Sequence, residues 1–172
     1  TNSFGTIIWS SPSWRIPNIE EQEDLMFFLD NGGKLFITGQ DFGYYINDTE
    51  FYKDYLHAEY VQDDTNLLGL TGVFDDPIGK GLDIEIFGGD GANNQFWPSE
   101  IDPVSPSTPI FTYNNFFPGE NELPQEIPKS MLPPQGEIKE LGSLWISSSG
   151  SGAIKVDTGT YKVVYFAFGF EA

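Results

Sequence analysis

The chain has 172 residues, 26 of them acidic and 8 basic, so its formal net charge at pH 7 is −18. Such a charge repels phosphate backbones and anionic membrane surfaces, which excludes nucleic acid as an expected partner. An aromatic content of 16% excludes disorder as the overall state, and no apolar run is long enough to insert into a bilayer. We therefore expect one folded domain over residues 1–172.

The acidic composition favours an extracellular or cell-surface protein. A strongly acidic surface keeps a protein dispersed, suits an extracellular or high-salt setting, and attracts divalent cations and cationic partners. The chain has no cysteine. Because this fits a reducing cytoplasm as well as a secreted protein without disulfides, cysteine usage leaves the compartment open.

The first forty residues predict a strand, a helix and a second strand. Residues 5–11 are an apolar, β-favouring run that ends in small polar residues. Asn18 and Glu21 predict a capping box, after which apolar residues recur at helical spacing up to Gly32. Gly32 and Gly33 supply the positive-φ stop that a helix C-terminus favours. Residues 35–37 are a short apolar run typical of a strand buried between two helical layers.

A glycine-rich turn, Gly39–Gly43, follows the second strand. Open α/β sheets place ligands and catalytic groups outside the carboxyl ends of their strands, so chemistry is expected at this turn, with Asp41 at its centre. Beyond the turn, Asp48 or Thr49 can cap a short helix that runs through Leu56 and buries an aromatic stripe.

From about residue 61 to residue 145 the pattern becomes β-rich. Prolines and glycines are frequent there, helical periodicity disappears, and strand-like runs occupy residues 69–74, 82–87 and 110–113. We interpret this part as a β-rich insertion.

The C-terminal segment predicts a hairpin. Residues 153–156 and 162–168 are strand-like, and Asp157–Thr160 is a suitable turn between them. The second strand is apolar on both faces, which indicates a place inside the sheet and puts Gly169 and Glu171 at a strand end.

Two of these elements resemble motifs of the class I glutamine amidotransferase-like superfamily, especially its divergent domains in large secreted or surface proteins. Active members carry a Gly-x-Cys-x-Gly nucleophile elbow and a Phe-His-Pro-Glu element. In this chain Gly39–Gly43 has Asp41 at the cysteine position, and Phe168–Glu171 has Gly169 at the histidine position. The resemblance implies an α/β three-layer sandwich with a mostly parallel, flavodoxin-like sheet, to which the β-rich insertion is added.

The resemblance also implies a piece of a larger protein. In the similar domains a βαβ portion precedes the strand that begins here at Gly5, and a helix follows the element that ends here at Glu171. Missing strands and a missing covering helix would expose pairing edges and apolar surface. We expect other domains or chains of a larger extracellular assembly as partners.

The chain lacks the groups for the family's acyl transfer. It has no cysteine, and its one histidine, His57, is far in sequence from both motifs. We expect a noncatalytic accessory, structural or binding domain. The alternative is a hydrolase in which Asp41 and Glu171 act as an acid/base pair or as metal ligands. The simplest interpretation of Asp41 is that its side chain caps the following helix.

A calcium site is a second candidate. Asp90, Asn93 and Asn94 lie in a glycine- and asparagine-rich loop and offer the oxygen ligands that calcium prefers. Their spacing differs from that of an EF-hand loop, and such residues also recur at turns for backbone reasons alone.

A third candidate site is a carbohydrate- or peptide-binding surface formed by exposed aromatic rings. The alternative is that these rings belong to ordinary core packing. The rings concerned are Trp9, Trp14, Tyr44, Tyr45, Phe96 and Trp97.

Overall fold

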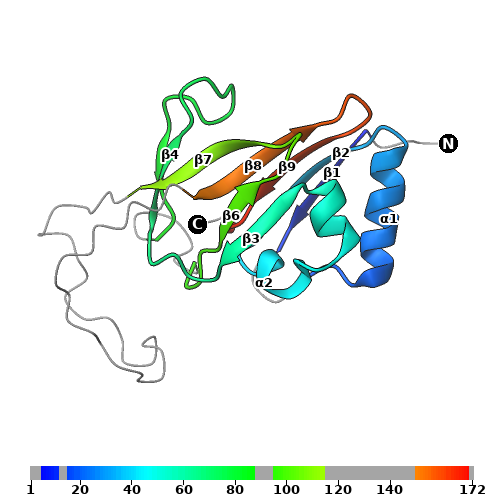
Figure 1. Cartoon of the computed structure of the whole chain (residues 1–172), viewed down its shortest axis with the longest axis horizontal. Helices are drawn as coiled ribbons and strands as arrows, with labels where there is room; N and C mark the ends of the chain where they lie inside the picture. Colours follow the sequence, from blue (N-terminus) through cyan, green and yellow to red (C-terminus); the bar gives the residue numbers. More distant parts are fainter. Residues whose placement is uncertain (1–4, 12–14, 88–94, 115–149, 171–172) are drawn as a thin grey trace, which may run out of the picture.

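The computed structural model describes residues 5–11, 15–87, 95–114 and 150–170 (Figure 1). These residues form one sheet, one helix of twelve residues, α1 (Ile19–Asp30), and two short helical turns, α2 (Phe42–Ile46) and η1 (Phe51–Tyr55). The strands in chain order are β1 (Thr6–Ser10), β2 (Lys34–Thr38), β3 (Ala58–Gln62), β4 (Gly69–Gly72), β5 (Asp83–Glu85), β6 (Glu100–Pro103), β7 (Thr108–Asn114), β8 (Ser151–Asp157) and β9 (Lys162–Phe166).

The sheet is mostly antiparallel and is curled into a half-barrel. Its strand order is β1-β2-β9-β8-β7-β4-β5, and β6 pairs with both β8 and β3. Two strand pairs are parallel, β1 with β2 and β2 with β9, and we call these three strands the parallel trio. The other pairs in the described part of the chain are antiparallel. In Figure 1, α1 lies at one end of the molecule and β4 at the other.

The expected three-layer α/β sandwich with a mostly parallel, flavodoxin-like sheet is therefore wrong. In the described part of the chain α1 is the only helix of seven residues or more, and the nine strands form a mostly-β fold. The sequence pattern misled because a central strand is apolar on both faces whatever the direction of its neighbours. The apolar β9 has a parallel neighbour on one side and the antiparallel β8 on the other.

The local predictions near the N-terminus are confirmed. Asn18 caps α1, because its side chain accepts a hydrogen bond from the Glu21 N–H at 3.0 Å and the Glu21 carboxylate accepts one from the Asn18 N–H at 2.9 Å. Gly32 follows the helix with a φ of 85°, a conformation that favours glycine. The predicted helix that ends near Leu56 is present as the single wide turn η1, which follows Thr49.

The C-terminal hairpin is also confirmed, with β8 and β9 paired antiparallel from Ala153↔Phe166 to Asp157↔Lys162. Strands β4 to β7 fall within residues 61–145 and continue the same sheet from β8. They extend it away from the parallel trio.

Two apolar clusters cover the two faces of the sheet. The larger cluster joins α1, α2 and η1 to one face through residues such as Leu29, Phe42, Tyr52 and Tyr165. The second contains side chains of β4, β7, β8 and β9, Ile86 and Phe168, with no residue from a described helix. We call this second side the helix-free face. No described helix has the length and apolar character needed to cross a membrane.

Candidate functional site

The turn after β2 and the segment after β9 meet at one edge of the sheet, which we call the crest. The Thr38 hydroxyl donates to the Phe168 carbonyl at 2.6 Å, and the Gly39 N–H donates to the Phe166 carbonyl at 3.2 Å. The parallel pairing of β2 with β9 brings these two strand ends together. Glu171, the predicted partner of Asp41, lies outside the described residues.

Asp41 is buried at the crest, directly before α2. The residue is 8% exposed, and its side chain makes no capping hydrogen bond to the helix. The interpretation of Asp41 as a side-chain cap is therefore wrong. Burial, and secondarily the negative charge of Asp63, raise the pKa of Asp41 to about 6. The crest thus holds a carboxyl group that binds its proton more tightly than an exposed aspartate does.

Residues 95–99 bind directly to the crest. The Ser99 hydroxyl donates to the Gln40 carbonyl at 2.6 Å, and the Trp97 N–H donates to the Gln40 side-chain oxygen at 3.3 Å. On the β9 side, the Gln95 side-chain oxygen accepts from the Gly169 N–H at 2.6 Å. These bonds join the ends of β2 and β9 to the single segment 95–99.

The hydroxyl of Ser99 contacts two acceptors at the crest, the Gln40 carbonyl at short range and the Asp63 carboxylate at longer range. Ser99 is fully buried, and its nearest acceptor is the Gln40 carbonyl, whereas the Asp63 carboxylate is 3.4 Å away. Burial raises the pKa of Asp63 despite the hydrogen bond from Ser99. Burial, with Asp63 as the next cause, raises the pKa of the Tyr60 phenol to about 12. The crest thus gathers two carboxyl groups with raised pKa values, those of Asp41 and Asp63, close to the Ser99 hydroxyl.

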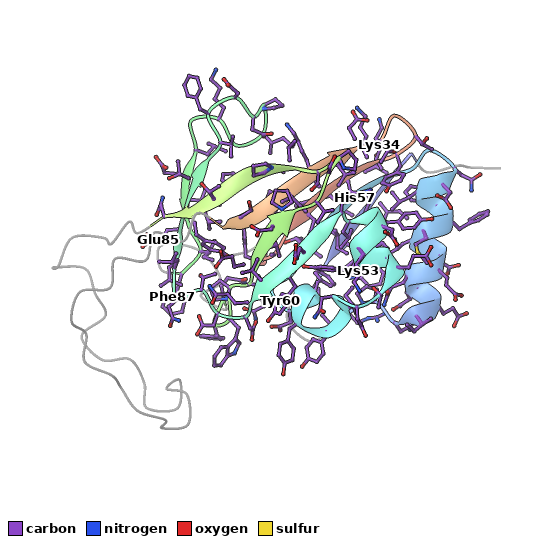
Figure 2. The ribbon with its side chains drawn as sticks, viewed as in Figure 1. Lys34, Lys53, His57, Tyr60, Glu85 and Phe87 are labelled. Carbon is purple, nitrogen blue, oxygen red and sulfur yellow. The ribbon has the colours of Figure 1, made fainter. Side chains whose placement is uncertain are left out.

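His57 lies at the other end of the parallel strands. Its Nε2 is 3.1 Å from the hydroxyl of Tyr161, the residue before β9 begins, and burial lowers its pKa. In Figure 2 it lies toward the end at which Lys34 begins β2. A five-residue strand, on the order of 15 Å long, thus separates His57 from the crest.

The predicted calcium ligands Asp90, Asn93 and Asn94 lie outside the described residues. Within the described ranges, no three acidic, histidine or cysteine side chains gather in an arrangement suited to a metal ion.

The predicted aromatic surface is divided by the structure. Tyr44 and Tyr45 are exposed on α2 and contact each other edge to face, with ring centroids 5.0 Å apart. Phe96 and Trp97 are exposed on the segment that binds the crest. Trp9 instead packs against the larger apolar cluster, and Trp14 lies outside the described residues.

A pocket of about 430 Å³ opens on the helix-free face beside the end of β9. Sequence reasoning missed it, although the alternation over residues 82–87 was a usable signal, since it puts Leu82, Ile84 and Ile86 on one face of the strand. Ten residues line the pocket: Ile78, Leu82, Ile84, Glu85, Ile86, Phe111, Phe166, Phe168, Gly169 and Phe170.

No protein-family model matches this chain, and no curated protein sequence shows significant similarity to it.

Proposed function

We propose that this chain is a noncatalytic accessory domain of a secreted or cell-surface protein, and that it binds an apolar group of a partner in the pocket on the helix-free face. The observation that carries the proposal is a contrast between two neighbouring places. The crest is tied to residues 95–99 by direct hydrogen bonds, whereas the pocket beside it is open and apolar.

The groups at the crest support a noncatalytic role. Acyl transfer needs a nucleophile next to a base. At the crest the Ser99 hydroxyl donates to a backbone carbonyl, and His57 lies at the opposite end of the strands. Asp41, at the cysteine position of the resembling family, is buried and shifted toward its neutral form.

We propose that the parallel trio, and no other part of the sheet, descends from an amidotransferase-like domain. Two features support it: Gly39–Gly43 follows β2, and the element beginning at Phe168 lies beside it through the bond from Thr38. The antiparallel strands beyond β9 are then an elaboration that provides the wall of the pocket.

The pocket has the size and chemistry of a binding site. Its volume lies within the range of small-molecule sites, which span roughly 300–1,000 Å³. Aromatic and aliphatic side chains dominate its lining, and Phe170 is 68% exposed at its edge. Apolar surface that no other described residue covers is typical of a contact site.

A neutral fluorescent probe, N-phenyl-1-naphthylamine, tests the proposal. We expect saturable fluorescence enhancement with the full chain, and affinity reduced at least about fivefold by Phe170→Ala, because the substitution removes part of the apolar lining. Phe27→Ala is the matched control, since Phe27 is 72% exposed but lies on α1, away from the pocket. Equal loss in both variants, or no saturable binding, would overturn the proposed site.

The hydrolase interpretation remains a second candidate because of one observation, the raised pKa of about 6 at Asp41 beside Asp63. Such a carboxyl group is suited to proton transfer near neutral pH. Hydrolysis of p-nitrophenyl acetate by the wild-type chain and by Asp41→Asn separates the candidates. We expect equal, background rates. A rate that depends on Asp41 and follows a pKa near 6 would favour the hydrolase.

A further inference from the structure

Among the described residues, the pocket borders a strand that has a neighbour on one side only. β5 is the last strand of the sheet order in the described part of the chain. Its pairing with β4 uses alternate residues, since the Gly72 N–H donates to the Leu82 carbonyl and the Ile86 N–H donates to the Leu68 carbonyl, both at 2.8 Å. In an antiparallel ladder the residues between them direct their backbone groups to the other side. The N–H and C=O groups of Asp83 and Glu85 therefore point to the outer edge of β5.

The side chains of β5 divide between two faces with opposite chemistry. Leu82, Ile84 and Ile86 all line the pocket and share one face of the strand. Asp83 and Glu85 are exposed and alternate with them, so their side chains share the other face, although Glu85 is also among the residues that line the pocket. On that face the Asp83 carboxylate accepts a hydrogen bond from Thr71 of β4 at 2.8 Å. Figure 2 shows Glu85 at the end of the sheet away from α1.

A strand added beside β5 would continue this alternation. Residues opposite Asp83 and Glu85 would place their side chains on the acidic face, and the residues between them would face the pocket. Opposite charge is favourable at such cross-strand positions, and like charge is not. A second copy of this chain, with its net charge of −18, is for the same reason a poor occupant.

We propose that the outer edge of β5 and the adjoining pocket bind an extended partner segment in which Lys or Arg alternates with large apolar residues. The segment adds a strand to β5, its cationic side chains face Asp83 and Glu85, and its apolar side chains enter the pocket. This is recognition by strand addition, in which backbone bonds give affinity and alternate side chains give specificity. The inference rests on the proposed function, which already assigns the pocket as a contact site.

The probe is the capped peptide acetyl-Lys-Phe-Lys-Phe-Lys-amide, titrated calorimetrically into the full chain. We expect it to bind at least about tenfold more tightly than acetyl-Lys-Lys-Lys-Phe-Phe-amide, which has the same composition without the alternation, and than the Glu-Phe-Glu-Phe-Glu analogue. Methylation of the central lysine's backbone nitrogen should reduce affinity by a similar factor, because that N–H is needed for strand pairing.

Matched variants locate the contact. Glu85→Gln should weaken the alternating peptide by about threefold to tenfold, since it removes one facing charge. Glu59→Gln is the control, because Glu59 is also exposed on a strand but lies on β3. Circular dichroism of both variants shows whether either has lost its fold.

The outcomes separate this inference from the proposed function. Equal affinity for the alternating and block peptides, or equal effects of Glu85→Gln and Glu59→Gln, would overturn strand addition at β5. If N-phenyl-1-naphthylamine still binds in a manner that depends on Phe170, the pocket remains a binding site and only the identity of the partner is wrong. If both the peptide and the naphthylamine fail to bind, the proposed function itself is wrong.

Discussion

At the scale of single residues, Asp41 is the position where sequence and structure lead to the clearest prediction. Its folded-state pKa of about 6 lies above that of an unfolded aspartate, so the folded state binds the proton more tightly. The stabilising effect of that proton is complete below pH ~4 and is lost as the pH rises toward ~6. Above that range the ionised carboxylate destabilises the folded state.

We therefore predict that Asp41→Asn raises the free energy of unfolding at pH 8 by on the order of 2 kcal/mol and changes it little near pH 4. Urea unfolding at both pH values measures the effect. Asp24→Asn is the control, because it removes the same charge from an exposed position on α1. Equal effects of the two substitutions at pH 8 would show that Asp41 is not held in an unfavourable environment.

At the scale of elements, the start of α1 is the feature that the sequence predicted most fully. Asn18→Ala removes the acceptor for the Glu21 N–H, so we expect the free energy of unfolding to fall by about 1 kcal/mol. Asn18→Ser keeps a capping oxygen and should retain most of the stability. Urea unfolding of both variants checks this, and an alanine variant as stable as the wild type would contradict the capping assignment.

Ser99 tests the hydrogen bonding of residues 95–99 to the crest. Ser99→Ala leaves the Gln40 carbonyl without its 2.6 Å donor inside the protein, so we expect a loss of about 1–2 kcal/mol. Ser107→Ala is a close control, because that hydroxyl donates to the His57 carbonyl at 2.8 Å, away from the crest. Amide hydrogen exchange of Trp97 and Gly169 should accelerate only in Ser99→Ala. Acceleration in both variants would show that the crest is not locally held by this bond.

The elements that the sequence predicted are those determined by local signals. The capping box at Asn18, the glycine stop at Gly32 and the hairpin turn at Asp157–Thr160 each act over a few residues. Whether a neighbour of β9 runs parallel or antiparallel to it depends on pairing between segments that are distant in sequence. The apolar sequence of β9 does not indicate that direction. The same limit applies to the candidate site. Asp41 was found from its turn, but its neighbour Asp63 and the bond from Ser99 come from segments that only the fold brings together.

At the scale of the whole molecule, the net charge of −18 dominates the electrostatics. Two ion pairs among the described residues, Arg15–Glu21 and Lys162–Asp157, are partly to largely exposed and each contribute little to stability. Raising NaCl from about 10 mM to about 150 mM shortens the screening length from about 30 Å to about 8 Å and weakens repulsion among the acidic groups. We predict a gain in unfolding free energy on the order of 1 kcal/mol, measured by urea unfolding. Lower stability in salt would mean that the attractive pairs outweigh the repulsion.

The two faces of the sheet have different roles in this account. Among the described residues, helices and turns cover one face, whereas the other face carries an apolar pocket beside the outer edge of β5. We propose that contact with a partner takes place on the helix-free face and not at the crest.

The most direct test is a two-dimensional amide NMR spectrum of the full chain titrated with N-phenyl-1-naphthylamine. We expect the largest shifts at the amides of Ile84, Ile86 and Phe170, around the pocket. Shifts concentrated instead at Gln40, Asp41 and Ser99 would contradict this proposal and would identify the crest as the binding site.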